Sequence, residues 1–273
     1  DMEKLCPDAW LINFTNPVGM VTEAILKYSN IKKIIGLCNI PIGMEKSTAK
    51  LLGVEKNRIR IKFGGLNHMV FGLNVYLDGE DCTELAIEKL CESLDQPTMQ
   101  NIAAVPWDPE FLRGLKILPC SYQRYYYMTP EMLNKQLKEF EDGTTRAETV
   151  KKIEAELFEL YRDLELKEKP ALLEKRGGAY YSDAACNLIN SIYNNKCDIQ
   201  AVNTKNNGSI TSLPYDCVIE VSSIITKDGP KPISIGELPI QVRGLVQQIK
   251  SFEIVGAKAA VTGDYNTALV AMT

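Results

Sequence analysis

The 273-residue chain lacks several patterns that identify common functional classes. It has no run of eighteen apolar residues, so it predicts neither a membrane span nor a membrane partner. Its net charge is −4 and no basic patch dominates, which excludes nucleic acid as the main partner. A Gly-x-Gly-x-x-Gly turn is also absent, although such a turn is typical of the first strand–helix junction in a dinucleotide-binding sheet.

Cysteine pairs of the Cys-x-x-Cys type are missing too. Eight cysteines are scattered along the chain without regular spacing, at positions 6, 38, 82, 91, 120, 186, 197 and 217. This pattern indicates neither a disulfide framework nor a structural zinc site. Reduced thiols and the lack of a visible signal peptide together predict a cytoplasmic protein.

What the chain does contain is an alternation of strands and helices. Strands are predicted at 9–14 and 34–37, each followed by a helix, at 18–28 and 41–52, which is the order of a doubly wound parallel sheet. Two antiparallel strands at 58–64 and 70–77 follow, with Asp78-Gly79 as their turn. Five helices come next, and the apolar stripe of the one at 145–164 faces a core; they cover 83–94, 110–115, 130–140, 145–164 and 183–193. Strands return at 199–203, 217–225 and 233–236, before helices at 239–260 and from 266.

This order predicts an α/β part followed by an α+β part. Residues 1–56 form the tail of a Rossmann-like sheet, and residues 57–273 form a mixed catalytic domain that binds substrate and metal. The chain opens within an alternating pattern and stops within a helix, so we expect it to be a piece of a longer polypeptide.

Two residues at predicted strand ends could bind a metal. Cys38 follows the apolar run 34–37, and His68, the single histidine, follows a strand through two glycines. Open α/β sheets bind ligands at such strand ends. A thiolate and a neutral imidazole suit a first-row metal. The alternative is structural, since a lone cysteine after an apolar run is commonly a small core residue.

Seven short motifs occur in an order that resembles family 4 glycoside hydrolases, and among them the 6-phospho-β-glucosidases. The resemblance covers essentially the whole chain. The motifs are Thr-Asn-Pro-Val (15–18), Cys-Asn-Ile-Pro (38–41), Gly-Leu-Asn-His (65–68), Ser-Tyr-Gln-Arg-Tyr-Tyr (121–126), Thr-Arg-Ala-Glu (145–148), Arg-Gly-Gly (176–178) and Asn-Asn-Gly (206–208).

The resemblance implies a glycosidase that depends on NAD and Mn²⁺, outside the usual two-carboxylate scheme. In this family NAD⁺ removes hydride from C3 of the sugar, and the ketone acidifies the C2 hydrogen. A tyrosine base then removes that proton, the aglycone leaves from C1, water adds and the ketone is reduced again. Mn²⁺ acts as a Lewis acid. The family also implies a lactate/malate dehydrogenase-like fold.

The implied roles fall on six residues of this chain. Cys38 and His68 match the metal ligands, although a Cys/His pair by its softness suits Zn or Fe better than Mn²⁺. Tyr122 matches the base at C2. Asn16, Asn39 and Arg146 match residues that bind the 6-phospho-β-glucoside substrate, and Asn16 also lies near the nicotinamide. Without the resemblance, Tyr122 is part of an aromatic core cluster, Asn16 caps a turn and Arg146 is a surface arginine.

Two other functions stay open at this stage. A lactate/malate-type NAD-dependent dehydrogenase would share the fold but use a histidine–aspartate pair without a metal-binding cysteine. A non-catalytic oligomerisation module would use the apolar helices as an interface, and a homo-oligomer (dimer or tetramer) is also expected of the glycosidase. Because the chain lacks the glycine-rich turn, we expect these 273 residues alone to be inactive.

Overall fold

The computed structural model describes residues 1–93, 96, 102–177 and 180–273. Its strands are β1 (Leu11–Asn13), β2 (Ile34–Gly36), β3 (Ile59–Leu66), β4 (Met69–Leu77), β5 (Glu80–Asp81), β6 (Leu118–Pro119), β7 (Ile199–Lys205), β8 (Val218–Thr226) and β9 (Gly229–Pro232). Its helices are α1 (Met2–Leu5), α2 (Val18–Tyr28), α3 (Ile40–Leu52), α4 (Thr83–Glu92), α5 (Pro109–Leu115), α6 (Arg124–Tyr127), α7 (Thr129–Glu141), α8 (Arg146–Leu160), α9 (Leu172–Arg176), α10 (Tyr181–Tyr193), α11 (Ile240–Thr262) and α12 (Tyr265–Met272), with 3-10 turns η1 (Lys56–Arg58) and η2 (Ser121–Gln123).

The described strands form one mixed sheet in the order β1-β2-β7-β8-β3-β4-β5, with β6 on β4 and β9 on β8. Only the β1–β2 pair is parallel among these ladders. A single antiparallel pairing, Gly36 with Asn203, joins β2 to β7. The strands of both predicted parts therefore belong to one continuous sheet, and the division at residue 56 stays a prediction.

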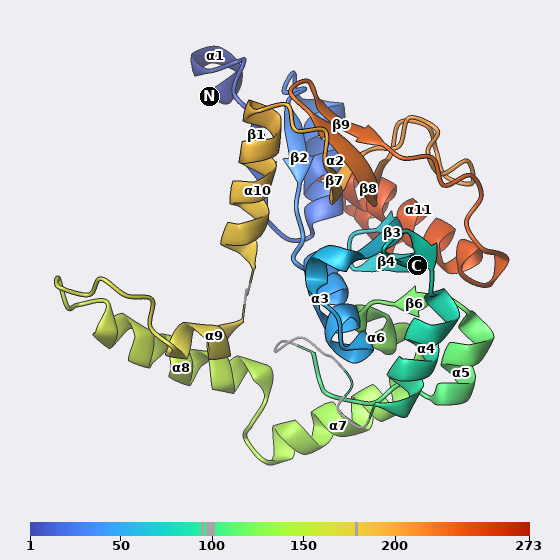
Figure 1. Cartoon of the computed structure of the whole chain (residues 1–273). Coiled ribbons are helices and arrows are strands. Elements are labelled where there is room, and N and C mark those ends of the chain that lie inside the picture. Colours follow the sequence, from blue (N-terminus) through green and yellow to red (C-terminus); the bar gives the residue numbers. More distant parts are fainter. Residues whose placement is uncertain (94–95, 97–101, 178–179) are drawn as a thin grey trace.

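Helices cover both faces of this sheet. Ile35 and Val202 point to α10, with which they share a core, whereas the adjacent Gly36 and Asn203 point to α2. The longest helix, α11, packs on α2 and on β3 and β8 through a core that includes Val242 and Val246. Figure 1 shows α3, α4, α5 and α6 grouped at the end of β3 and β4. These layers are those of an α/β sheet flanked by helices.

Gly36 sits where α2 approaches the sheet most closely. A Cβ atom there would lie 2.6 Å from Thr22 Oγ1 and 2.6 Å from Val18 Cγ1, both on α2. These distances are much shorter than a van der Waals contact, so this packing of α2 on the sheet requires glycine at position 36.

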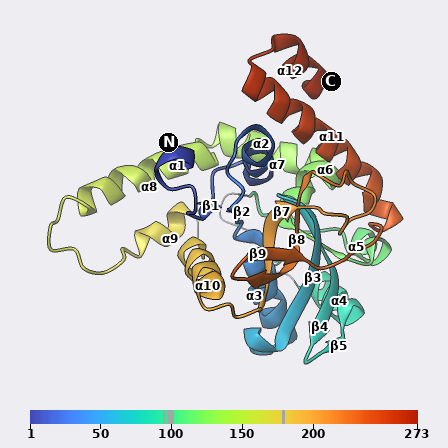
Figure 2. The same ribbon diagram turned by 90° about the horizontal axis from the view of Figure 1, so that it is seen from above.

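The helices α8 and α9 form an arm that extends away from the sheet (Figures 1 and 2). Ile153 and Leu157 of α8 are buried, whereas Phe158 and Leu160 are exposed. Within the described residues α8 contacts α9, and Ile153 and Leu157 belong to none of the three apolar cores around the sheet.

Most predicted elements are confirmed, and three details were wrong. The turn between β3 and β4 lies at Asn67-His68, while Asp78-Gly79 turns β4 into β5. The strand expected at 233–236 is instead β9, four residues earlier, because the sequence Gly-Pro-Lys-Pro pairs with β8. The helix predicted to reach residue 164 ends at Leu160. A helix that could span a membrane does not occur in the part of the chain that the structure describes.

Candidate active site

The turn between β3 and β4 places His68 beside Tyr122. The His68 backbone has φ 61°, and Gly65 before it has φ 144°. Both angles lie in the positive-φ region, which residues other than glycine and asparagine rarely adopt. A Cβ at Gly65 would lie 2.3 Å from the carbonyl oxygen of Met69. The imidazole of His68 stacks on the ring of Tyr122, with centroids 3.9 Å apart and planes at 18°. The predicted metal ligand and the predicted base are thus in direct contact.

Cys38 approaches the same pair from the end of β2. The residue is 3% exposed and lies in the segment between β2 and α3. The Cys120 thiol donates to the carbonyl oxygen of His68 at 3.4 Å, and Cys120 packs in the same core as Cys38 and Tyr122. We name Cys38, Asn67, His68, Cys120 and Tyr122 the strand-end cluster. Three sequence segments that are distant along the chain meet in it.

A buried polar layer lies beneath the strand-end cluster. Glu220 of β8 is completely buried, and its Oε1 accepts from Asn203 Nδ2 at 2.9 Å. The Asn67 amide is near enough to the Glu220 carboxyl and the Cys38 thiol to favour their charged forms. Its Nδ2 nevertheless meets no acceptor at ordinary hydrogen-bond geometry, which makes it a buried donor without a partner. Asn67 therefore lies where the buried polar layer meets the strand-end cluster.

The protonation states follow from this burial. Desolvation lowers the pKa of His68 to about 4, so the ring is neutral near pH 7 and can coordinate a metal. Burial first, and then the neighbouring Glu220, raise the pKa of the Cys38 thiol well above its usual range. Burial likewise raises the pKa of Glu220 to about 8. Without a cation the cluster therefore holds a thiol rather than a thiolate.

The donor set of the cluster fits a divalent first-row metal with open positions. Cys38 and His68 offer one sulfur and one neutral nitrogen, and metal binding would secure the thiolate by displacing its proton. No group of three or more His, Cys, Asp or Glu side chains suited to a metal occurs within the described ranges. A metal held here would thus need oxygens from substrate or water to complete its coordination.

Of the other three predicted site residues, Asn39 is next to the strand-end cluster, Asn16 is near one of its neighbours, and Arg146 is in the arm. Asn39 precedes α3 and is buried next to Cys38. Asn16 is exposed after β1, and its side chain lies near the phenol of Tyr181, which in turn lies near Cys38. Arg146 is the first residue of α8, and its Nη1 and Nη2 donate to the carbonyl oxygens of Lys175 and Arg176. Within the described part of the chain, no contact links Arg146 to the cluster.

Two motifs of the resemblance, Arg-Gly-Gly (176–178) and Asn-Asn-Gly (206–208), contain glycine turns. Gly178 of Arg-Gly-Gly lies outside the described residues. Asn206, Asn207 and Gly208 line a surface hollow with Ser209, Pro232 and Ser234, at the other end of β7 from the Ile199 end. Asn206 bonds the carbonyls of Ile210, Leu213 and Pro214, which explains it as a structural residue of the turn.

Sequence reasoning missed several residues of the site. Asn67 and Cys120 directly precede the predicted His68 and the Ser-Tyr motif, so adjacency could have indicated them. Glu220 gave no such signal, because it is one carboxyl within the strand Val218–Thr226, and its burial depends on Asn203 of a different strand.

The chain matches two parts of one enzyme family. Residues 1–54 match "Family 4 glycosyl hydrolase", and residues 63–273 match "Family 4 glycosyl hydrolase C-terminal domain". A "Probable 6-phospho-beta-glucosidase" of Bacillus subtilis is 60% identical over all of this chain, which spans 62% of that protein's length. The "6-phospho-beta-glucosidase" of Escherichia coli is 43% identical over the chain, which spans 61% of it.

Solved structures give the same picture. The 6-phospho-beta glucosidase from Thermotoga maritima, determined with manganese, NAD⁺ and glucose-6-phosphate, superposes with a TM-score of 0.83 at 34% identity. The superposition covers 96% of this chain and 60% of that one. Lactate dehydrogenase from Eimeria maxima, at 16% identity and a TM-score of 0.56, shares the fold, which confirms the expected dehydrogenase-like architecture.

Proposed function

Because the chain belongs to glycosyl hydrolase family 4, we propose that the protein carrying it hydrolyses 6-phospho-β-glucosides with NAD⁺ and Mn²⁺. The observation that carries the proposal is the stack of His68 on Tyr122 within the strand-end cluster, next to the buried thiol of Cys38. This arrangement joins a candidate metal ligand to a candidate proton acceptor. The relatives at 60% and 43% identity bear the same activity in their names.

Each residue of the cluster has a role in this proposal. Bound NAD⁺ would accept the hydride from C3, and a divalent ion held by Cys38 and His68 would act as a Lewis acid. Tyr122 receives the proton from C2 of the sugar, after which the aglycone leaves from C1. The His68 ring fixes the plane of the phenol by stacking, and the free Nδ2 of Asn67 donates to a sugar oxygen.

The remaining predicted residues bind and orient the ligands. Asn39, beside Cys38, contacts a sugar hydroxyl. Asn16, which lies near Tyr181 after the end of β1, contacts the substrate and the nicotinamide. Arg146 contacts the substrate after exchanging its present acceptors, the carbonyls of Lys175 and Arg176.

We also propose that the protein is a homo-oligomer. Leu133, Leu137 and Phe140 are exposed at a spacing of four and three residues on α7, which places them on one helical face. The adjacent arm exposes Phe158 and Leu164. Light scattering of the wild type and of a Leu137→Lys variant tests this, and a monomeric wild type would contradict it.

The activity is tested with the complete gene product. We expect release of the aglycone from an aryl 6-phospho-β-glucoside only when both NAD⁺ and Mn²⁺ are present, and exchange of the C2 hydrogen with solvent deuterium during turnover. Hydrolysis that persists after removal of NAD⁺ and chelation of the metal would refute the proposal. Oxidation of lactate or malate without any metal would favour the dehydrogenase alternative instead.

A further inference from the structure

The first turn of α10 lies at the ends of the two parallel strands. The Tyr181 ring meets the Phe14 ring edge-on, with centroids 5.0 Å apart and planes at 89°, and Phe14 directly follows β1. The Tyr181 phenol also lies near Asn16 and near Cys38, which follows the end of β2. Open α/β sheets bind ligands at the carboxyl ends of their strands. Tyr181 is therefore at the ligand-binding end of β1 and β2.

Contacts on two sides fix the position of this turn. Lys46 of α3 places its Nζ 3.5 Å from the centroid of the Tyr180 ring. Further along α10, Ala184 and Leu188 are buried in the core between this helix and the sheet. A cation over an aromatic face and a buried apolar stripe both stabilise the helix where it lies. The Tyr181 ring is thus held in place without any use of its hydroxyl group.

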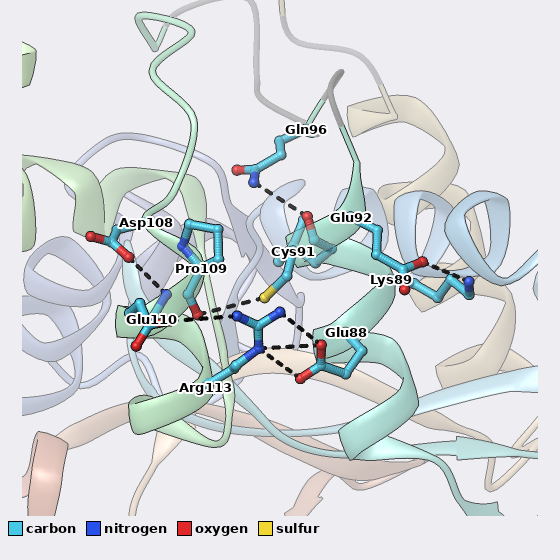
Figure 3. Close-up of polar contacts among 10 residues, drawn as sticks. Glu88, Lys89, Cys91, Glu92, Gln96, Asp108, Pro109, Glu110 and Arg113 are labelled. Atoms are coloured by element: carbon cyan, nitrogen blue, oxygen red, sulfur yellow. Dashed lines mark hydrogen bonds and ion pairs between the residues drawn. The ribbon is translucent and has the colours of Figure 1, made fainter.

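The Tyr181 hydroxyl has no hydrogen-bond acceptor among the described residues. The Asn16 amide lies near its oxygen and favours the ionised phenol, which makes that amide a donor rather than an acceptor. A group that is already paired looks different, as Figure 3 shows for the Arg113 guanidinium on the Glu88 carboxylate. Tyr181 is partly exposed, whereas Cys38 is 3% exposed. The phenol therefore borders the strand-end cluster from the solvent side.

The proposed reaction develops negative charge at an oxygen that has no assigned donor. When the aglycone leaves from C1, its oxygen keeps the electron pair of the broken bond. Tyr122 is assigned to C2 as proton acceptor, and Cys38 and His68 are assigned to the metal. Donors aimed at developing charge are usually a large part of catalysis. A phenol keeps its proton near pH 7 and is an O–H donor.

We propose that the Tyr181 hydroxyl donates a hydrogen bond to the glycosidic oxygen and stabilises the negative charge that develops there as the aglycone leaves. This inference rests on the proposed function. The aglycone departs toward solvent, and Tyr181 borders the cluster from that side. Asn39 and Asn67 are buried, and they remain the donors to the oxygens of the sugar ring.

Leaving-group dependence tests this in the complete gene product. A charge-assisted hydrogen bond contributes about 1.5–3 kcal/mol, so we expect Tyr181→Phe to lower kcat/KM for the phenyl 6-phospho-β-glucoside about 10- to 100-fold. The 4-nitrophenyl glucoside should lose less than about threefold, because its leaving phenolate delocalises the charge and needs less stabilisation. Tyr180→Phe is the matched control, since it removes the same atom from the adjacent residue and keeps the ring under Lys46. It should leave both values unchanged.

Exchange at C2 separates assistance at C1 from a structural role. In Tyr181→Phe, Tyr122 still removes the C2 proton, but the aglycone leaves more slowly. Relative to product formation, deuterium from solvent should therefore enter the unreacted phenyl substrate faster in the variant than in the wild type. Parallel losses of exchange and turnover, or equal losses for the two glucosides, would overturn the inference alone.

A measurement on the wild type keeps the inference testable if the variant does not fold. In protein labelled with ¹³C at tyrosine Cζ, the Tyr181 signal should shift with glucose 6-phosphate, whose O1 takes the position of the leaving oxygen. It should shift much less with 1-deoxyglucose 6-phosphate, which lacks O1. Equal shifts with both ligands would overturn the inference. Failure of the wild type to hydrolyse either glucoside would overturn the proposed function as well.

Discussion

At the scale of single residues, the site combines positions that are chemically reactive with positions that are conformationally restricted. His68 is the clearest case, because one residue supplies an imidazole, accepts a hydrogen bond from Cys120 and holds a left-handed backbone. Tyr122 depends on it through the ring stack. Substitutions at His68 and Tyr122 can therefore remove a reactive group while they keep the backbone conformation or the ring stack.

Tyr122→Phe removes the phenol oxygen but keeps the ring that stacks on His68. We expect turnover in the complete gene product to fall about 10²- to 10⁴-fold, the usual cost of a lost general base. Exchange of the C2 hydrogen should fall in parallel, while Mn²⁺ affinity stays within about twofold of wild type. Turnover equal to wild type would remove Tyr122 from the reaction.

His68→Asn removes the imidazole at little cost to the backbone, since asparagine tolerates a positive φ. We expect Mn²⁺ affinity, measured by electron paramagnetic resonance, to fall by at least about tenfold, while the far-ultraviolet circular dichroism stays unchanged. Loss of a residue that only hydrogen-bonds to a metal ligand typically costs about 10- to 100-fold in metal affinity, so loss of a ligand itself should cost at least as much. An unchanged Mn²⁺ affinity would show that His68 is not a ligand.

The same substitution predicts a change in pH dependence for the metal-free protein. The folded-state pKa of His68 is about 4, below the ordinary 6.5, so the unfolded chain binds the proton first. This group therefore lowers folding stability as the pH falls from about 6.5 to 4, and has no effect above that window. Urea unfolding across this range should show a shallower loss of stability in His68→Asn. Parallel curves for both proteins would contradict the buried, neutral ring.

At the scale of elements, the sequence was most informative where one periodic pattern determined the structure. The helix predicted at 18–28 matches α2 residue for residue, because its apolar positions and its start after Pro17 agree. The strand expected at 233–236 failed because the pairing with β8 favours Gly229–Pro232, and a short apolar run contains no information about its partner strand.

In the candidate site, too, local motifs predicted some features, whereas features that depend on tertiary contacts were missed. The motifs predicted that Cys38 and His68 follow strands, and both do. They did not indicate Glu220, since the importance of that carboxyl lies in its burial. That burial arises only when β7 and β8 pair and Asn203 donates to Glu220.

The contact of α2 with the sheet gives an element-scale prediction. Gly36→Ala would press a methyl group against Thr22 and Val18, so we expect a loss of about 1–3 kcal/mol in the free energy of unfolding. Gly43→Ala is the control: that position lies within α3 and has open space around its added Cβ. There, helix propensity predicts a gain of about 0.5–1 kcal/mol. Urea denaturation measures both, and equal effects would contradict the packing described.

At the scale of the whole molecule, the described chain contains the strand-end cluster but no glycine-rich turn for a pyrophosphate. The turn after β1 reads Phe-Thr-Asn-Pro and that after β2 reads Leu-Cys-Asn. The chain also spans only 62% of its Bacillus subtilis relative. Dinucleotide affinity comes largely from the pyrophosphate at a helix N-terminus.

We therefore expect the isolated 273 residues to show no micromolar binding of NAD⁺ by calorimetry, and no hydrolysis of a 6-phospho-β-glucoside. The complete gene product, assayed in parallel, is the control. Micromolar affinity in the isolated chain would mean that the two turns described above suffice for the dinucleotide.

The pairing of Gly36 with Asn203 also determines when the protein can fold during its synthesis. These two residues are 167 positions apart along the chain, the difference between 203 and 36. At about 5–20 residues per second, a ribosome needs roughly 10 to 30 s to bridge that distance. Through this interval β2 has an unpaired edge and the apolar side of α2 has no α11 to cover it. The edge of β2 therefore stays open to pairing with other chains until β7 and β8 emerge.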